Sequence, residues 1–328
     1  MREETVIVPG RANLIGEHID YHNLPVLPIA LRRAIRVRFT PRADRRIRAA
    51  SAVYGEREFE WTARLEPAAA GDWENYVRAA AQIVATCWGL GCGIDATVES
   101  DLPAAAGLSS SSALLAAFTL ALLRANRWRA TFDELMEVLP EGEQFVGTRG
   151  GGMDHAAVLG SRAGCASLIS FNPVAIRHIP IPSEWAFLVA DSLVRAEKSG
   201  TVRDRYNAIR AAAVGDHARS EAARVHAAVD ALERDRPERF GELLLESHAS
   251  LRDCLQVSVP ALDRLVNAAM TSGALGARLT GAGFGGCAIV FCLRRDLARV
   301  RAGIIERFYA GDAQHLVDAE PGAGAVHS

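Results

Sequence analysis

The sequence has little net charge of either sign. Its 37 basic residues almost balance 39 acidic ones, so the formal net charge is −2 at pH 7. No global electrostatic field therefore draws the chain to nucleic acid or to a membrane surface. The arginine-rich stretch at 42–48 is more typical of a solvated face than of a nucleic-acid site. We expect neither nucleic acid nor a membrane among its partners.

Long apolar runs and paired cysteines are also missing. No apolar stretch is long enough to cross a bilayer, and the first residues lack the apolar core of a secretory signal. The six cysteines form no Cys-x-x-Cys pair and have no histidine at metal-ligand spacing. Scattered cysteines of this kind are typical of reduced thiols. These absences predict a cytoplasmic protein without a cysteine-based metal site.

What remains is an ordinary globular composition, with 49% hydrophobic and 23% charged residues. The 328 residues suffice for two domains or for one large one. A shift in composition near Asn172 and Pro173 predicts two domains, at 1–172 and 173–328. The Gly/Ala-rich tail after Glu320 is expected to be loosely ordered.

Local signals locate several elements. β-Branched residues predict a strand over 5–8 that ends at Pro9–Gly10. A helix is expected from Asp72 to about Trp88. Thr131 and Glu134 form a capping box for another helix. Pro140 is expected to break or kink that helix, since proline lacks the backbone N–H that the helix needs.

The most informative stretch runs from Asp101 to Leu115 and contains four consecutive serines at 109–112. Alternating apolar residues predict a strand before it, and 108–123 is typical of a buried helix. The first N–H groups of a helix are unpaired and partly positive, and serine hydroxyls add further donors. This helix start therefore suits a polyphosphate. Simple N-capping by serine is the alternative interpretation.

A second polar cluster lies between two apolar strand-like runs near the N-terminus. Its hydrogen-bonding residues are Arg11, Asn13, Glu17, His18 and Asp20. Carboxylates and an imidazole can fix several hydroxyl groups of a small polyhydroxylated ligand. A polar surface connector is the alternative interpretation.

Two glycine-rich stretches follow. Gly150–Gly152 precede Asp154, and consecutive glycines let a backbone approach a ligand closely. Asp154 has an alternative role as the cap of the short helix after it. Residues 279–286 match Gly-x-Gly-x-x-Gly, but a strand-like run follows where a dinucleotide-binding loop requires a helix. This excludes the Rossmann interpretation and predicts a glycine turn pressed against a ligand or against the serine stretch.

Together these motifs, in this order and without a Walker loop, resemble the GHMP family of small-molecule kinases. Residues 10–21 are similar to the galactokinase signature, 103–113 to the family's phosphate loop and 279–286 to its third motif. Residues 73–77 and Tyr206–Asn207 are further galactokinase-like fragments. The serine run and 147–154 look closer to the N-acetylgalactosamine kinase branch.

The resemblance implies an α/β (α+β) fold, the GHMP kinase fold. Its N-terminal half would be like ribosomal protein S5 domain 2 and its C-terminal half ferredoxin-like, with the site between them. It also implies an ATP- and Mg²⁺-dependent kinase that phosphorylates the anomeric hydroxyl of galactose or a close relative. A small-molecule sugar is then the expected substrate, and we expect a monomer.

Family roles carry over where residues match. Asp154 would face the anomeric hydroxyl, and Arg11 would lie near both that hydroxyl and the γ-phosphate. The residues expected to hold the sugar are Glu17, His18, Asp20, Gly151 and Tyr206. Those expected at the nucleotide are Gly107, Leu108, Ser109, Ser110, Ser111, Ser112 and Ala113. Ser111 and Glu143 would bind Mg²⁺, which prefers hard oxygen ligands. All of this requires Asp154 to lie beside the serine turn.

Departures from the family pattern leave the sugar open. Ala105 replaces a glycine of the phosphate loop, and residues 22–25 replace a glycine-containing segment near the sugar hydroxyls. The alternatives are a 1-kinase for N-acetylgalactosamine, arabinose or a uronic acid, and a non-catalytic sugar- and ATP-binding regulator. A mevalonate- or homoserine-type kinase is a further alternative, although the Glu17-His18-x-Asp20 cluster favours a sugar.

Overall fold

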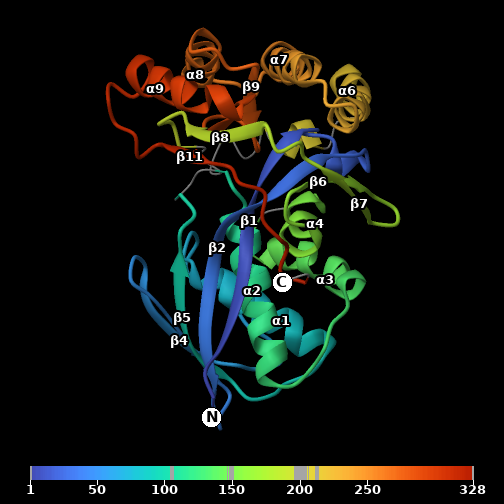
Figure 1. Cartoon of the computed structure of the whole chain (residues 1–328). Coiled ribbons are helices and arrows are strands. Elements are labelled where there is room, and N and C mark those ends of the chain that lie inside the picture. The colour runs from blue at the N-terminus through green and yellow to red at the C-terminus, as the bar shows by residue number, and fades with distance from the viewer. Residues whose placement is uncertain are drawn as a thin grey trace.

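The computed structural model describes residues 2–103, 107–145, 147, 151–195, 205, 207–210 and 214–326. Two sheets organise the chain, as predicted for a mixed α/β protein (Figure 1). Within the described part of the chain, no helix is long and apolar enough to cross a membrane. Tyr206 and Ala105 lie outside the described residues.

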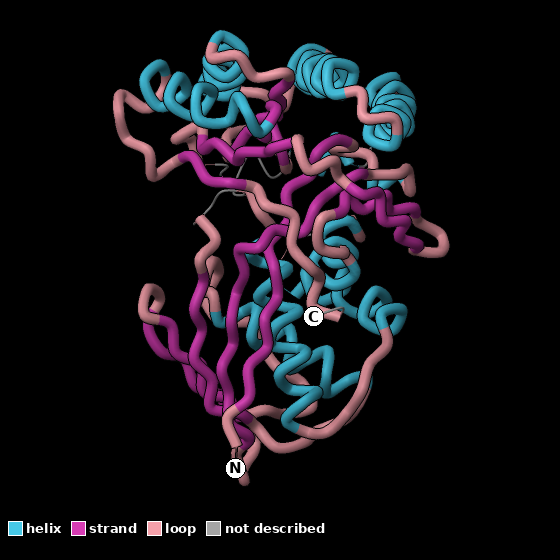
Figure 2. Tube along the Cα trace, in the orientation of Figure 1, coloured by secondary structure: helices cyan, strands magenta, loops and turns pink. Residues whose placement is uncertain are grey.

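The N-terminal half contains a five-stranded sheet of order β1-β2-β5-β3-β4. Helix α2 packs on β1 and β2, and α1 packs on α2, so helices cover one face of this sheet (Figure 2). The strands are β1 Glu4–Ile15, β2 Leu27–Pro41, β3 Arg46–Ser51, β4 Gly55–Glu60 and β5 Ile94–Ser100. The helices are η1 Asp20–His22, α1 Glu74–Cys87, α2 Ser110–Ala125, α3 Phe132–Phe145 and α4 Met153–Gly160.

The C-terminal half contains a four-stranded sheet of order β11-β8-β10-β9. Helices α7 and α8 pack on β9 and β10, on the side away from the N-terminal half (Figure 1). The strands, with those of a separate hairpin, are β6 Cys165–Ser170, β7 Ala175–Pro180, β8 Trp185–Asp191, β9 Gly276–Thr280, β10 Cys287–Leu293 and β11 Leu316–Asp318. The helices are α6 Asp216–Glu233, α7 Pro237–Asp253, α8 Pro260–Thr271, η2 Arg294–Asp296 and α9 Leu297–Arg307.

The first strand is longer than predicted. β1 continues through Pro9 and Gly10 to Ile15, so the expected strand end at those residues is wrong. β1 lies at the edge of its sheet, where a proline without an N–H is tolerated. Its register against β2 shifts between Pro9 and Arg11 and again before Ile15. As a result Arg11 lies on a strand and is buried, rather than on a surface connector.

Most of the helix predictions are confirmed. In the capping box, the Thr131 backbone N–H donates to Glu134 Oε2 at 2.7 Å, and the Glu134 N–H donates to Thr131 Oγ1 at 3.2 Å. The predicted break at Pro140 is wrong, because α3 continues to Phe145. Packing of α3 on α1 and α4 stabilises the helix beyond the proline. This extension places Glu143 on α3.

The predicted domain boundary lies between β6 and β7. These two strands pair antiparallel on either side of Asn172 and Pro173, from Cys165–Pro180 to Ser170–Ala175. β6 in turn meets the first half, since Ile169 and Val26 exchange backbone hydrogen bonds of 3.0 and 3.1 Å. The division into 1–172 and 173–328 stays a prediction.

The C-terminal tail is ordered against the N-terminal half, so the expectation of loose order is wrong. The Gly322 N–H donates to Ala30 O at 2.8 Å, and Gly324 N–H to Ser161 O at 2.8 Å. A Cβ on Gly324 would lie 2.3 Å from Leu159 O, so glycine permits this close backbone approach. The Gly/Ala composition therefore reflects packing rather than disorder.

Deleting residues 321–328 is expected to lower the free energy of unfolding by about 3–5 kcal/mol, because several buried hydrogen bonds of about 1 kcal/mol each disappear. Denaturant unfolding of the two chains measures this difference. The control is Val326→Ala, whose side chain is 40% exposed and whose effect should stay below about 0.5 kcal/mol. Equal stability of the truncated and full chains would contradict the packing role of the tail.

Candidate active site

The serine turn at the start of α2 is built against β1. The Arg11 N–H donates to Leu108 O at 3.0 Å, and a Cβ on Gly10 would lie 2.9 Å from the same oxygen. Ser109 has a left-handed φ of 57° and precedes the first residue of α2. Its side chain makes no capping hydrogen bond to the helix, so the capping interpretation does not account for it. The first turn closes when Ala113 N–H donates to Ser109 O at 2.9 Å.

The third motif lies against this turn, as predicted. A Cβ on Gly281 would lie 3.4 Å from Gly107 O, and one on Gly107 would lie 3.7 Å from Thr280 O. Both glycines have positive φ, 88° and 67°, which glycine adopts at little cost. The strand β10 begins at Cys287, directly after the glycines. Backbone from opposite halves of the chain therefore meets at the start of α2.

Asp154 lies at the same place. Arg11 Nε donates to Asp154 Oδ1 at 2.7 Å, and Arg11 NH1 donates to Gly107 O at 2.6 Å. Asp154 stands in the first turn of α4, whose start at Gly152 has no side-chain cap. The capping role considered for Asp154 is therefore wrong. The predicted position of this carboxylate beside the serine turn is confirmed.

Both members of this ion pair are held in the charged form. Burial opposes ionisation of Asp154, but the Arg11 guanidinium and the Ser109 hydroxyl hold its pKa below the ordinary value. Burial likewise opposes the charge on Arg11, whereas Asp154 and Glu17 raise its pKa. The Asp154 side chain keeps 27% of its surface exposed, against 6% for Arg11. The ionised carboxylate of Asp154 is thus the more accessible member of the pair.

Asp20 and Gly151 form the next contact. A Cβ on Gly151 would lie 1.7 Å from Asp20 Oδ2, so only glycine fits beside this carboxylate. Asp20 also interacts with the backbone of Met153, the first residue of α4. Burial, reinforced by the nearby Asp154 and Glu17, raises the pKa of Asp20 to about 6. Asp20 connects the segment at 10–21, which is similar to the galactokinase signature, to the helix α4 that carries Asp154.

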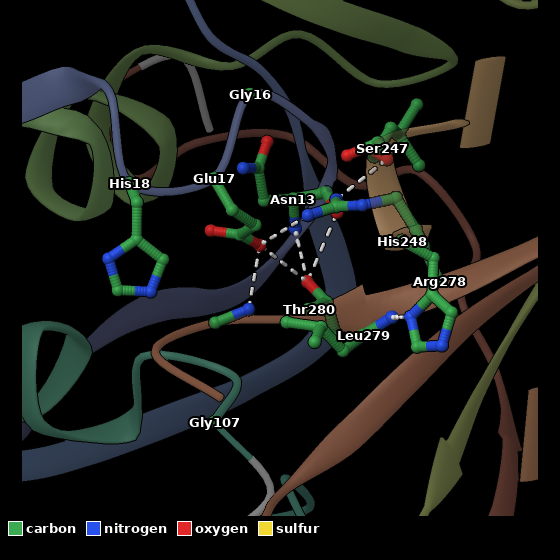
Figure 3. A network of polar contacts seen from close by, with 12 residues as sticks. Asn13, Gly16, Glu17, His18, Gly107, Ser247, His248, Arg278, Leu279 and Thr280 are labelled. Atoms are coloured by element: carbon green, nitrogen blue, oxygen red, sulfur yellow. Dashed lines mark hydrogen bonds and ion pairs between the residues drawn. The ribbon is translucent and has the colours of Figure 1, made fainter. Parts of the chain in front are cut away.

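Glu17 and His18 face the third motif (Figure 3). Glu17 Oε1 accepts the Gly281 N–H at 2.6 Å and the Thr280 hydroxyl at 3.2 Å. His18 Nε2 lies 3.1 Å from Ala282 O, and Nδ1 lies 3.0 Å from the Tyr21 hydroxyl. Burial lowers the pKa of His18. A neutral ring that donates through Nε2 satisfies both contacts, since a carbonyl only accepts.

One departure from the family pattern keeps the local conformation. Asn23, in the segment that replaces a glycine-containing one, has a left-handed φ of 60°. Asparagine adopts this region more readily than most residues other than glycine. Its N–H donates to Asp20 O at 2.9 Å and ends η1. The turn that supports Asp20 is therefore formed without glycine.

Glu143 stands at the opposite side of the serine turn. Its Oε1 accepts the Ser112 hydroxyl at 2.6 Å and lies 3.2 Å from Nε2 of the buried His155. Burial raises the pKa of Tyr76, and the nearby Ser111 side chain opposes this rise. Burial opposes the charge of Glu143, yet His155 and Ser112 hold its pKa below the ordinary value. Nowhere in the described ranges do three or more His, Cys, Asp or Glu side chains cluster as metal ligands.

Sequence reasoning missed the residues of the C-terminal half that support the site. They are His217, Glu221, Ser247 and Arg278. The sequence contains one local signal for Arg278, which is its position inside the otherwise uncharged segment Gly276–Thr280. Because buried strands rarely hold an unpaired charge, this arginine indicates a buried polar partner.

Comparisons with known proteins follow the same three motifs. The galactokinase galactose-binding signature matches residues 2–41. The GHMP kinases N terminal domain matches 75–161 and the GHMP kinases C terminal domain matches 228–310.

Similar proteins agree. A galactokinase of Roseiflexus sp. (strain RS-1) is 33% identical over 363 residues, covering 98% of this chain and 92% of that protein. A galactokinase of Chloroflexus aurantiacus is 34% identical, with 86% and 82% covered. The crystal structure of Lactococcus lactis galactokinase complexed with galactose has a TM-score of 0.88 at 25% identity, covering 98% and 94%. A mevalonate kinase structure, at TM-score 0.76 and 19% identity over 97% and 98% of the two chains, shares the fold.

Proposed function

Because this chain belongs to the galactokinases of the GHMP kinase family, we propose that it transfers the γ-phosphate of ATP to the anomeric hydroxyl of galactose. The observation that carries the proposal is the junction of Arg11 with Asp154 and Gly107. It brings an ionised carboxylate, a guanidinium and the start of a buried helix together. A cytoplasmic location and a monomeric state belong to the same proposal.

Phosphoryl transfer needs positioning and neutralisation of charge more than covalent help. The N–H groups at the start of α2 and the Ser109–Ser112 hydroxyls suit the phosphates of the nucleotide. Arg11 is placed to stabilise the charge that develops on the transferred group. Since Arg11 keeps the pKa of Asp154 low, Asp154 orients the sugar hydroxyl first and accepts its proton late in the transfer.

The donor set at the serine turn fits a magnesium ion. Glu143 offers a carboxylate of lowered pKa, and the Ser112 hydroxyl, next in sequence to Ser111, donates to it. Mg²⁺ takes few protein ligands and completes its shell with phosphate oxygens and water, so a large cluster is not needed. Ser111 and Glu143 would hold the ion, which neutralises phosphate charge when bound.

The sugar would lie between Asp154 and the carboxylate of Asp20. Glu17 and Asp20 offer carboxylate acceptors for several hydroxyl groups, and Gly151 leaves room beside Asp20. His18, whose ring nitrogens contact Ala282 O and the Tyr21 hydroxyl, belongs to the sugar site by family resemblance. Tyr206 belongs to this set by family resemblance. The half-buried position of Asp20 suits a group that contacts both protein and ligand.

A coupled assay of ADP release tests the activity. With Mg²⁺ and ATP present, we expect turnover with galactose. The panel also contains N-acetylgalactosamine, arabinose and galacturonate, whose relative kcat/KM values decide the sugar. No ADP with any of them would overturn the kinase assignment, and binding of sugar and ATP without ADP would identify a regulator instead.

The raised pKa of Asp20 predicts a pH dependence of sugar use. The pKa of Asp20 is raised to about 6, so its carboxyl is protonated at lower pH and loses acceptor capacity. Below that pH, kcat/KM for galactose should fall about tenfold per pH unit. The measurement is kcat/KM between pH 5 and 8. Asp20→Asn should have a low kcat/KM at pH 8 and a flat profile below pH 7. An unchanged profile in the variant would show that another group titrates.

Unfolding of the protein would not explain a fall of kcat/KM below pH 6. A carboxyl whose pKa is higher in the folded than in the unfolded protein stabilises the fold at low pH, and this contribution disappears as pH rises through about 6. The Asp20 contribution to stability therefore increases as activity declines. Thermal unfolding of wild type and Asp20→Asn at pH 5 and 8 separates the two effects.

A further inference from the structure

The turn that carries Glu17 is held from the C-terminal half of the chain. Glu17 Oε1 accepts the Gly281 N–H at 2.6 Å, and Glu17 O lies 3.1 Å from Nε2 of His217 on α6. The Asn13 N–H lies 3.2 Å from the Thr280 hydroxyl oxygen. Asn13 lies on β1 and Glu17 in the turn after it, whereas their partners here come from α6 and from the end of β9. Figure 3 shows the contacts of Asn13 and Glu17 with Arg278 and Thr280.

Arg278 lies at the centre of these contacts. It is fully buried on β9. Its NH1 group donates to Asn13 O at 3.1 Å and to Leu14 O at 2.9 Å, and NH2 lies 3.4 Å from Glu17 Oε1. The planar guanidinium can meet two carbonyls and a carboxylate at once, which a lysine ammonium cannot do in the same geometry.

A second buried acid holds the same turn and is paired with Arg224 at 2.8 Å. Glu221 on α6 is fully buried and accepts the Gly16 N–H at 3.0 Å and the Ser247 hydroxyl at 2.6 Å. Burial opposes its ionisation, whereas Arg278 and then Arg224 lower its pKa. Arg278 thus lies beside the Glu17 carboxylate and also lowers the pKa of Glu221, whose carboxylate accepts the Gly16 N–H. Such a buried charge is retained at a cost and calls for a reason beyond stability.

We propose that Arg278 is a positioning residue for the sugar site, and that the C-terminal half thereby controls sugar affinity. Oε1 of Glu17 is bound to the Gly281 N–H. The direction of Glu17 Oε2 therefore depends on the conformation of the turn at 13–17, to which Arg278 and Glu221 are hydrogen-bonded. Loss of Arg278 lets this turn move relative to Asp20 and Asp154. The proposal rests on the proposed sugar kinase activity.

The test uses Arg278→Lys, which keeps the positive charge, and Thr280→Val, which removes the hydroxyl contacts to Glu17 and Asn13. The control is Arg295→Met, since the Arg295 side chain is 77% exposed. Galactose and ATP-analogue affinities are measured by calorimetry, with kcat and KM for each substrate. For Arg278→Lys we expect the galactose Kd to rise roughly 10–100-fold and the ATP-analogue Kd to change by less than about twofold.

Two further measurements separate positioning from general loosening. In a Glu17→Gln background the added effect of Arg278→Lys should become smaller, because one of the contacts of Arg278 is with the Glu17 carboxylate, whereas those with Asn13 O and Leu14 O remain. Hydrogen exchange over residues 13–18 should accelerate in Arg278→Lys and in Thr280→Val, but not in the control. If Arg278→Lys fails to fold, Thr280→Val provides the same tests.

Unchanged galactose affinity in Arg278→Lys, or equal loss of sugar and nucleotide affinity, would overturn the proposal. So would an undiminished effect in the Glu17→Gln background. A wild-type chain that binds no sugar would instead defeat the proposed function. Hydrogen exchange would then still report whether Arg278 holds the turn, so the two failures are distinguishable.

Discussion

Replacing Asp154 by asparagine is expected to lower kcat with galactose by roughly 10²–10⁴-fold. The amide can still meet Arg11 Nε through its oxygen, but it cannot accept the proton of the anomeric hydroxyl. It also leaves the buried Arg11 without its counter-charge, which lies 2.7 Å away in the wild type. Steady-state ADP release with saturating galactose and ATP measures the change.

The matched control for this change is Asp133→Asn. Asp133 is an exposed acid in the first turn of α3, whereas Asp154 stands in the first turn of α4. Its replacement should leave kcat unchanged within about twofold. Galactose and ATP-analogue binding in Asp154→Asn should persist, since the loss falls on the transition state. A kcat within tenfold of wild type would remove Asp154 from the chemistry.

Replacing Arg11 by methionine should lower kcat by roughly 10²–10³-fold, the usual cost of losing one preorganised charge at the transferred group. The change removes the hydrogen bond to Gly107 O, which ties the serine turn to β1. It also removes the charge that lowers the pKa of Asp154, so that pKa should rise. The acidic limb of the kcat–pH profile should therefore move to higher pH, and profiles of kcat between pH 5 and 9 measure both effects.

Arg48→Met serves as the control for the arginine. Arg48 pairs with Glu56 on the exposed face of β3 and β4, so its loss should affect neither kcat nor its pH profile. Calorimetric titration with an ATP analogue checks that the Arg11→Met site still forms. A lower kcat with an unshifted acidic limb would contradict the electrostatic coupling of Arg11 and Asp154.

These expectations explain why Asp154 and Asp20 differ despite their proximity. Both are acids at the proposed sugar site, and burial raises the pKa of each. Arg11 more than offsets burial for Asp154, whereas burial dominates for Asp20 and the carboxylates of Asp154 and Glu17 add to it. Asp154 therefore stays ionised to a lower pH than Asp20, whose pKa is raised to about 6.

Features that depend on near neighbours were predictable from the sequence. The capping box at Thr131 and the buried helix after the serines follow from residues within one or two turns. The glycine turn before β10 follows from the glycines of 281–286 and from the run of apolar residues after them. The family motifs also pointed to Arg11 and Asp154, because the type and order of residues can be read from a sequence, whereas the distances between them cannot.

Only the tertiary structure decided which of these groups meet. Arg11 and Asp154 are 143 positions apart, and Arg278 reaches carbonyls more than 260 positions away. The same holds for the tail, whose glycines look disordered until the backbone of β2 and α4 lies beside them. The physical reason is that burial and pairing of charge depend on the whole fold. The residues next to an acid in the sequence therefore do not indicate which distant residue keeps it ionised.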